Sequence, residues 1–305
     1  MRALFIIALL KLFAVFSLPT LHRIGAAIGT LLYFLPNKAR MITTINIQHC
    51  FPNKSGDEQR QLIKSSLIET GKTFTENAAF WQWPLPMLTP LIHETPSTEQ
   101  LKAAIHSSKG VILLVPHLGA WEIAGMYCAQ LYPTTCLYRP PRMAALDGLI
   151  KRGRERMGLK PAPITQQGIR LLSRALKDHE WIGILPDQDP GENGGVYAPF
   201  FGHPANTMTL ASRLAMKSDC AVFCVYAERL EKGHGYLLHC KTAPMELSTG
   251  TLEQSVSALN RMVEECVMQL PAQYQWSYKR FKNQPPGMPN LYRRSKAKLT
   301  PFSDR

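Results

Sequence analysis

The sequence lacks the marks of several protein classes. Its seven cysteines are odd in number and form no CxxC pair, so there is no disulfide framework to read and a reducing compartment is expected. Cys220 and Cys224 lie in a strand-like stretch without further paired ligands, so no metal site is expected. A mean hydropathy of −0.12 excludes a membrane protein with many spans. No internal repeat or low-complexity segment occurs.

Acidic residues are also scarce, and the excess of positive charge is local. The 305 residues include 35 Lys and Arg against 22 Asp and Glu, and 45% are hydrophobic, which is ample for a core. Residues 138–177 hold ten basic and two acidic side chains, and residues 278–305 hold eight and one. Such clusters attract nucleic acid, anionic lipid, a phosphorylated substrate or an acidic protein. Nucleic acid is not expected, because no zinc-finger, RRM or helix-turn-helix signature is present.

The N-terminus is apolar in two runs. Residues 3–18 contain only Lys11 and Ser17 as polar residues, and a second run covers residues 24–35. Neither run reaches the roughly 20 apolar residues of a usual spanning helix. Two buried core helices would explain the pattern, and so would a cleaved signal peptide, although Lys11 interrupts the run and no A-x-A site follows. We favour a retained membrane anchor over residues 1–35, either one tilted span or an interfacial hairpin, followed by one domain over residues 36–305.

Buried strands that alternate with helices predict an α/β fold, a layered and largely parallel sheet flanked by helices. Capping boxes at Ser55 and Thr251 open two of the predicted helices. Strands are predicted at 111–115, 134–138, 181–185, 220–226 and 236–241. Helices are predicted at 55–81, after 97, and at 120–131, 143–157, 167–178, 207–218 and 251–270. Chemistry in such sheets gathers at the carboxyl ends of the strands, so the residues after 115, 138 and 185 are the candidates.

His117 and Glu122 follow the first of these strands. His117 lies at the strand end and Glu122 in the first turn of the next helix, so the chain between them can fold back and bring the two side chains together. A carboxylate on one imidazole nitrogen fixes the tautomer and leaves the other nitrogen to take a proton from a hydroxyl. The nucleophile would be a substrate hydroxyl, because no G-x-S-x-G elbow occurs. A strand-capping histidine and a glutamate favoured at a helix start would give the same spacing.

Three further side chains belong to the same edge of the predicted sheet. Asp187 follows the third strand in a PDQDPG stretch, where the spacing fails for a calcium loop. Arg139 and Arg154 belong to the first basic cluster, and an arginine fork can bond two phosphate oxygens at once.

In addition, the chain resembles a known family, the late acyltransferases of lipid A biosynthesis in Gram-negative inner membranes. The resemblance covers nearly the whole chain and rests on an ordered series of blocks. These are Asn46 to Phe51-Pro52, His117-x4-Glu122 within VPHLGAWEIAG, YRPPR, RGRERMG, ILPDQDPG, PFFG, and Tyr274 to Lys282.

The resemblance implies a glycerolipid-acyltransferase-like fold and an enzyme of the inner membrane whose catalytic domain faces the cytoplasm. The donor would be an acyl carrier protein thioester and the acceptor a phosphorylated lipid A precursor, with no cofactor. His117 would be the general base and Glu122 would orient it, while Arg139, Arg154 and Asp187 would bind substrate or shape the site. An apolar acyl slot is expected near Phe200 and Phe201, since a thioester must be kept from water.

Two alternatives stay open at this point. The first is an acyltransferase acting on glycerolipids or another glycolipid, although glycerolipid enzymes carry Asp at the position of Glu122. The second is a membrane-tethered protein that binds anionic lipid without catalysis. Acyl chain length and the acceptor hydroxyl are not readable from the residues.

Overall fold

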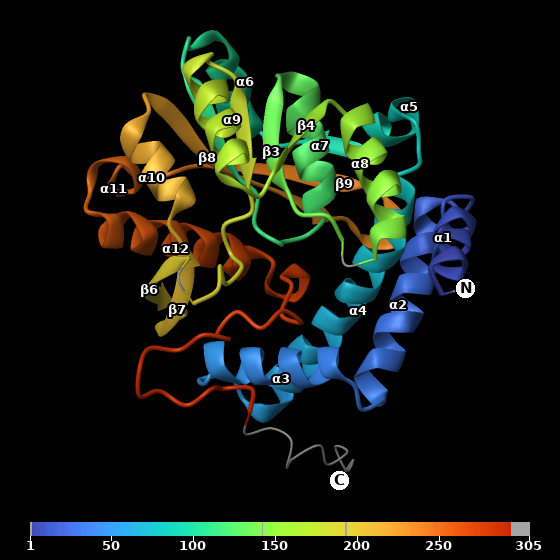
Figure 1. Cartoon of the computed structure of the whole chain (residues 1–305). Coiled ribbons are helices and arrows are strands. Elements are labelled where there is room, and N and C mark those ends of the chain that lie inside the picture. The colour runs from blue at the N-terminus through green and yellow to red at the C-terminus, as the bar shows by residue number, and fades with distance from the viewer. Residues whose placement is uncertain (1, 142, 193, 294–305) are drawn as a thin grey trace.

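The computed structural model describes residues 2–141, 143–192 and 194–293, and Figure 1 shows its course. The strands are β1 (Ile92–Glu94), β2 (Gly110–Leu114), β3 (Thr134–Tyr138), β4 (Leu159–Pro163), β5 (Trp181–Ile184), β6 (Gly195–Phe200), β7 (His203–Met208), β8 (Cys220–Arg229) and β9 (Tyr236–Thr242). The α-helices are α1 (Arg2–Phe13), α2 (Leu18–Phe34), α3 (Lys38–Cys50), α4 (Gly56–Phe80), α5 (Leu85–Leu88), α6 (Thr98–Ala103), α7 (Trp121–Leu131), α8 (Asp147–Arg156), α9 (Gln166–Lys177), α10 (Leu210–Lys217), α11 (Glu246–Thr249) and α12 (Leu252–Gln269).

Seven strands form one sheet in the order β1-β9-β8-β2-β5-β3-β4, and only the β8–β9 pair is antiparallel. This confirms the predicted α/β fold with a largely parallel sheet. Both edges are distinctive, since β1 has three residues and β4 carries Pro161 and Pro163. A separate antiparallel hairpin, β6–β7, lies beside α12 (Figure 1).

The central strand β2 is buried on both faces, as its continuous apolar run predicts. Ile112 and Leu114 belong to a core that also contains residues of α9, α10 and α12. Val111 and Leu113 belong to a second core that also contains residues of α6 and α7. The sheet therefore separates two hydrophobic layers, and its carboxyl edge is left for chemistry.

Local signals explain several boundaries. Both predicted capping boxes are formed, at Ser55 for α4 and at Thr251 for α12. The helix predicted from 207 begins only at Leu210, because the preceding residues pair in β7. The sequence does not predict β1, β4, β6 and β7, because β1 has only three residues and each of the other three contains proline, which argues against a strand.

The N-terminal apolar segment forms two helices rather than one. Figure 1 shows α2 lying along α4, and the two backbones meet closely at glycines. A Cβ at Gly29 would lie 2.3 Å from the Cα of Ile68, and one at Gly71 would lie 2.1 Å from the carbonyl oxygen of Gly25. One face of α2 is therefore a structural part of the domain.

Within the described residues, no single helix has the length and apolarity to cross a membrane. The bent pair α2 and α3, with an angle of 79° between them, passes that test by length and composition. The membrane anchor predicted over residues 1–35 stays a prediction. Residues 294–305, which hold four of the eight basic residues of the second cluster, lie outside the described residues.

Candidate active site

Adjacent parallel strands bring the predicted site residues to one edge of the sheet. His117 follows β2 and Asp187 follows β5, and these strands are neighbours, with the Val115 N–H donating to the Ile184 carbonyl over 2.9 Å. Arg139 follows β3, and β3 pairs with β5 on the side of β5 that faces away from β2. The topology thus places all three beyond the carboxyl ends of neighbouring strands.

His117 is held by Asp187 at two points. Its Nδ1 lies 2.8 Å from Oδ1 of Asp187, and its backbone N–H donates to Oδ2 over 2.9 Å. Burial raises the pKa of the Asp187 carboxyl, but the charge and hydrogen bonds of His117 outweigh burial and hold this pKa below its usual value. An ionised carboxylate only accepts, so Nδ1 carries the proton in the neutral imidazole. Nε2 is then the acceptor, and the amide nitrogen of Gln188 lies 3.1 Å from it.

Glu122 is paired with Arg154 rather than hydrogen-bonded to His117. Nε of Arg154 donates to Oε2 over 3.0 Å, Nη2 of Arg154 donates to Oε1, and Nε1 of Trp81 donates to Oε2 over 3.4 Å. Burial raises the pKa of the Glu122 carboxyl, but the Arg154 guanidinium more than offsets this and lowers that pKa. The prediction that Glu122 orients the imidazole by a hydrogen bond is therefore corrected, because Asp187 occupies that place. The charge of His117 still acts on Glu122, and it contributes to the lowered pKa.

The turn that joins His117 to Glu122 is held by contacts with the backbone of Ala227 and Gln273. Gly119 has φ of +60°, and a Cβ there would lie 2.0 Å from the Ala227 carbonyl oxygen, so only glycine fits. The Ala120 N–H donates to that same Ala227 carbonyl over 2.8 Å, and the Gly119 N–H donates to the Gln273 carbonyl over 3.0 Å. We call residues 117–122 the HxxxxE turn.

An apolar slot opens beside Glu122 and Arg154. It runs between β2, β3, β5 and α7, and the surface that lines it is mostly apolar. Its lining residues are Leu113, Val115, Trp121, Glu122, Gly125, Thr134, Cys136, Leu137, Arg154, Leu159, Gly183 and Leu185. Glu122 and Arg154 are the charged residues of this lining.

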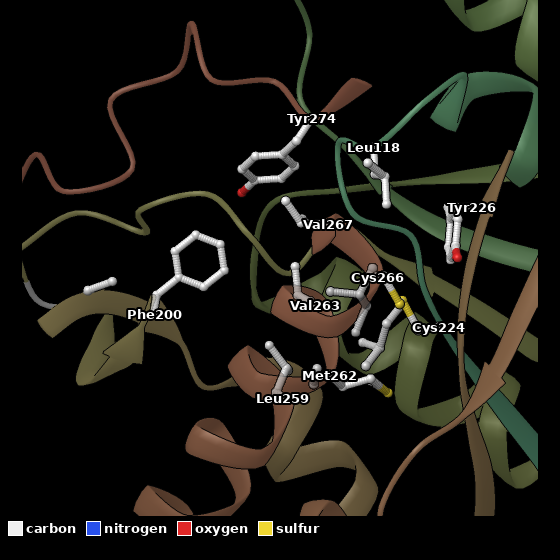
Figure 2. Packing of buried hydrophobic residues seen from close by; sticks show 14 of the residues in the cluster. Leu118, Phe200, Cys224, Tyr226, Leu259, Met262, Val263, Cys266, Val267 and Tyr274 are labelled. Atoms are coloured by element: carbon white, nitrogen blue, oxygen red, sulfur yellow. The ribbon is translucent and has the colours of Figure 1, made fainter. Parts of the chain in front are cut away.

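The apolar slot described above is not bordered by Phe200 or Phe201, the residues near which a slot was expected. Phe200 is fully buried and packs near Tyr274 and Phe281, with the ring centroids 6.2 Å apart in each case. Figure 2 shows Phe200 and Tyr274 on one side of a packed cluster with Val263 and Val267 of α12. Phe200 is therefore part of the hydrophobic core.

The two predicted arginines have different surroundings. The Arg154 guanidinium carbon lies 5.4 Å from the centroid of the Tyr138 ring, so Arg154 is fixed by both Tyr138 and Glu122. Arg139 is exposed and lines a groove that also includes Tyr138, Lys151 and Thr165. Arg154 therefore lies in the slot beside Glu122, whereas Arg139 lies in a separate groove.

Some residues of the site were not predicted. Gln188, Gln273 and Ala227 contact His117 or the HxxxxE turn, and only Gln188 had a sequence signal, its place beside Asp187. Among the described residues, no group of three or more His, Cys, Asp and Glu side chains could hold a metal ion.

Comparison with known proteins gives matches over most of the chain. A family model described as bacterial lipid A biosynthesis acyltransferase matches residues 2–283. The lipid A biosynthesis palmitoleoyltransferase of Escherichia coli (strain K12) is 29% identical over 278 residues, which covers 90% of this chain and 89% of that protein. The lipid A biosynthesis lauroyltransferase of the same strain is 27% identical over 276 residues, with 90% and 89% covered. A lipid A biosynthesis acyltransferase of Haemophilus influenzae is 27% identical over 281 residues, with 90% and 88% covered.

Proposed function

Because the chain belongs to the family of bacterial lipid A biosynthesis acyltransferases, we propose that it moves a fatty acyl chain from an acyl carrier protein thioester to a hydroxyl of a lipid A precursor. The chain is an acyltransferase, so a non-catalytic lipid binder is excluded. The acceptor class is supported by the relatives, whose names refer to lipid A biosynthesis.

His117 is the general base of the proposed reaction. Its Nε2 takes the proton from the acceptor hydroxyl while the hydroxyl oxygen forms a bond to the thioester carbonyl carbon. When the carbon–sulfur bond of the resulting tetrahedral intermediate breaks, the imidazolium returns the proton to the thiolate. The products are the ester and a free thiol, so protons and electron pairs balance without a cofactor.

Asp187 and Glu122 share the role that the sequence analysis gave to Glu122 alone. Asp187 fixes the imidazole tautomer and ring direction, and it stabilises the imidazolium once that forms. Glu122 adds a second negative charge near the imidazolium and holds Arg154 at the slot. We propose that Arg154 faces the thioester oxygen as charge develops on it.

The apolar slot beside Glu122 is the proposed acyl-chain site. Its aliphatic walls exclude water from the thioester, which otherwise hydrolyses. Arg139 and Lys151 line the groove next to it and are suited to a phosphate of either substrate. The exposed Arg152 and Arg170 add positive charge for an acidic carrier protein.

The N-terminal helices are the proposed membrane contact, with residues 1–35 as anchor and the catalytic domain on the cytoplasmic side of the inner membrane. Leu31, Phe34 and Leu35 are exposed at one end of α2, and Lys38 is exposed next to them. Apolar side chains beside a cation suit an interface with anionic lipid. Because α2 also packs on α4, we propose an interfacial contact rather than a free span.

The observation that carries the proposal is the His117–Asp187 pair at the sheet edge, with Nε2 as acceptor beside the apolar slot. We test it by measuring acyl transfer from acyl carrier protein thioester to a lipid A precursor. His117→Ala and Asp187→Asn are expected to lower kcat by about 10²–10⁴-fold with the fold retained.

The matched control is His239→Ala, because His239 forms a similar pair with Glu228 over 2.8 Å outside the site. Wild-type turnover in His117→Ala would refute the mechanism. Transfer to a glycerolipid acceptor, with none to the lipid A precursor, would favour the glycerolipid alternative instead.

A further inference from the structure

A buried charge network lies next to the HxxxxE turn and takes no part in the proposed chemistry. Arg229 at the end of β8 is 4% exposed and Glu76 of α4 is fully buried, with Nε of Arg229 2.8 Å from Oε2 of Glu76. Nη1 of Arg229 also donates to Glu69 over 2.6 Å, and its Nη2 donates to Thr73 over 3.0 Å. Burying such a pair has a desolvation cost that its attraction often fails to recover, so stability alone is a weak reason for it.

The network reaches the turn through Arg229 and Gln273. Nη2 of Arg229 lies 3.4 Å from the Gly119 carbonyl oxygen, and the Gly119 N–H donates to the Gln273 carbonyl over 3.0 Å. The Gln273 side chain in turn accepts from the Arg229 N–H over 2.8 Å and donates to the Arg229 carbonyl over 3.0 Å. Both peptide groups of Gly119 are therefore held by these two residues, which are themselves joined.

The same network includes the N-terminal apolar helix. Nε2 of His22, on α2, lies 2.9 Å from Oε2 of Glu76, and the Tyr236 hydroxyl donates to that same oxygen over 2.9 Å. Continuous contacts thus run from α2 through Glu76 and Arg229 to Gly119.

We propose that Arg229 and Gln273 are positioning residues that hold Gly119, and with it the separation of His117 and Glu122, and that α2 is coupled to the turn through Glu76. The proposal rests on the proposed acyl transfer for its rate prediction. It also implies that the position of α2 on the rest of the domain affects kcat.

Two variants test the positioning role, Arg229→Lys and Gln273→Ala. Lysine keeps the charge opposite Glu76 but lacks the fork that spans Glu76 and the Gly119 carbonyl. Gln273→Ala leaves every buried charge paired and keeps the backbone carbonyl that accepts from Gly119. It removes the two side-chain hydrogen bonds that join this backbone segment to Arg229, so it tests the support of the turn even if Arg229→Lys folds poorly. Leu259→Ala, a fully buried truncation in α12 outside the network, is the control for lost stability without loss of the turn contacts.

The first readout needs no activity. We expect the amide protons of Gly119 and Ala120 to exchange with deuterium at least tenfold faster in both variants, and unchanged in Leu259→Ala at equal distance below its Tm. Unchanged exchange in both folded variants would overturn the proposal.

The second readout is the steady-state rate. We expect kcat to fall about 10- to 100-fold in both variants with KM for either substrate within about twofold, since a misplacement of about 1 Å can cost that much. The proposal would also be overturned if Leu259→Ala lost as much kcat as the two variants for the same decrease in Tm. Failure of the proposed function is distinct, because the wild type itself would then transfer no acyl group.

The coupling to α2 is tested at His22. His22→Leu removes the donor to Glu76, whereas His22→Gln keeps one. We expect faster exchange at Gly119 and a lower kcat in His22→Leu, and recovery of at least half of the loss in His22→Gln. Equal behaviour of both variants and the wild type would remove α2 from the network.

Discussion

At the scale of single residues, two buried carboxylates near His117 stay ionised for different reasons. Asp187 is held ionised by His117 itself, and Glu122 mainly by Arg154, in each case against the effect of burial. Each carboxylate thus has its own cationic or donor partner. His117 is the one group that both of them stabilise when it gains a proton.

Gly125 is the residue where the slot can be narrowed without strain. It lies on α7 and lines the slot, and a Cβ there would meet nothing within 4 Å. We expect Gly125→Leu to fold at least as stably as the wild type, because glycine costs about 0.8–1.0 kcal/mol in a helix. We also expect the preferred acyl chain to become shorter.

The measurement is kcat/KM across a series of saturated acyl carrier protein thioesters. Rejection of the longest chains should reach about 10–200-fold per methylene that no longer fits, with Gly125→Ala intermediate. An unchanged chain-length profile in Gly125→Leu would place the acyl chain elsewhere.

The sequence predicts which site residues lie at the sheet edge, but it does not predict which of them are hydrogen-bonded to one another. The strand run before His117 put it at a sheet edge, and the same reasoning put Asp187 there. The partner of His117 lies 70 residues away, however, and depends on β2 and β5 being neighbours. Strand order is a tertiary property, so the nearer Glu122 was the better sequence candidate although it pairs with Arg154.

At the scale of elements, α4 and α2 are joined by close glycine contacts and by one buried ion-pair network. Thr75 of α4 adds a hydrogen bond from its hydroxyl to the Leu21 carbonyl over 2.8 Å. The seam therefore combines apolar packing with close backbone approach and buried polar groups.

Glu76 makes the stability of this seam depend on pH. Burial raises the pKa of its carboxyl, but Arg229 and His22 outweigh burial and lower that pKa to about 2 from 4.5. Because the pKa is lower in the folded state, this stabilisation is complete above about pH 5 and is lost as pH falls towards 2. We expect Glu76→Gln to cost about 3–5 kcal/mol at pH 7, since it leaves Arg229 buried with one charged partner fewer.

Urea unfolding between pH 7 and pH 3 measures this effect. The wild type should lose stability on acidification more steeply than Glu76→Gln, and the two curves should converge. Glu253→Gln is the control, since Glu253 is exposed in the first turn of α12, outside this seam. Parallel curves for the wild type and Glu76→Gln would contradict the assignment.

Elements with strong local signals were predictable, and those defined by distant partners were not. The strands of β2, β3 and β5 and the capped helices α4 and α12 were found from apolar runs and capping boxes. The β6–β7 hairpin contains a proline in each strand, and it takes its place from contacts with α12. The close approach of α2 to α4 was not predictable, because a glycine carries no signal for the residue that it approaches, and the membrane anchor stays a prediction.

At the scale of the whole molecule, we expect the exposed end of α2 to contact the membrane. Changing Leu31, Phe34 and Leu35 to Ser should weaken binding to vesicles by about tenfold per residue, since each buried side chain is worth about 1.5–3 kcal/mol. Deletion of residues 1–35 is a poorer test, because it also removes His22, which contacts Glu76.

Flotation with vesicles that contain anionic lipid measures this binding. Met245→Ser is the control, since Met245 is exposed directly before α11, which lies on the opposite side of the molecule from α2 (Figure 1). Equal loss in the control would show nonspecific apolar contact, and no loss in the α2 variant would exclude this end from the interface.

Charge on α8 and α9 gives the second prediction at this scale. Reversing Arg152 and Arg170 to Glu is expected to raise KM for the carrier-protein donor and to weaken its salt dependence, with kcat kept, since rim charges act mainly on association. Arg156 is left unchanged, because its guanidinium also donates to the Trp83 carbonyl over 2.9 Å, so replacing it would remove a structural contact together with the charge. If donor KM and salt response stay unchanged, the acceptor is the better partner for this charge.

The proline-bearing edge strand has a consequence for how copies of this protein behave in a crowded cell. In a strand, successive peptide N–H groups point to opposite sides, and residues 160 and 162 have donors that can serve β3. Pro161 and Pro163 then fall on the open side, where a foreign strand would need N–H groups that proline does not have. The opposite edge, β1, ends after three residues. A sheet of seven strands therefore offers almost no template for edge-to-edge aggregation.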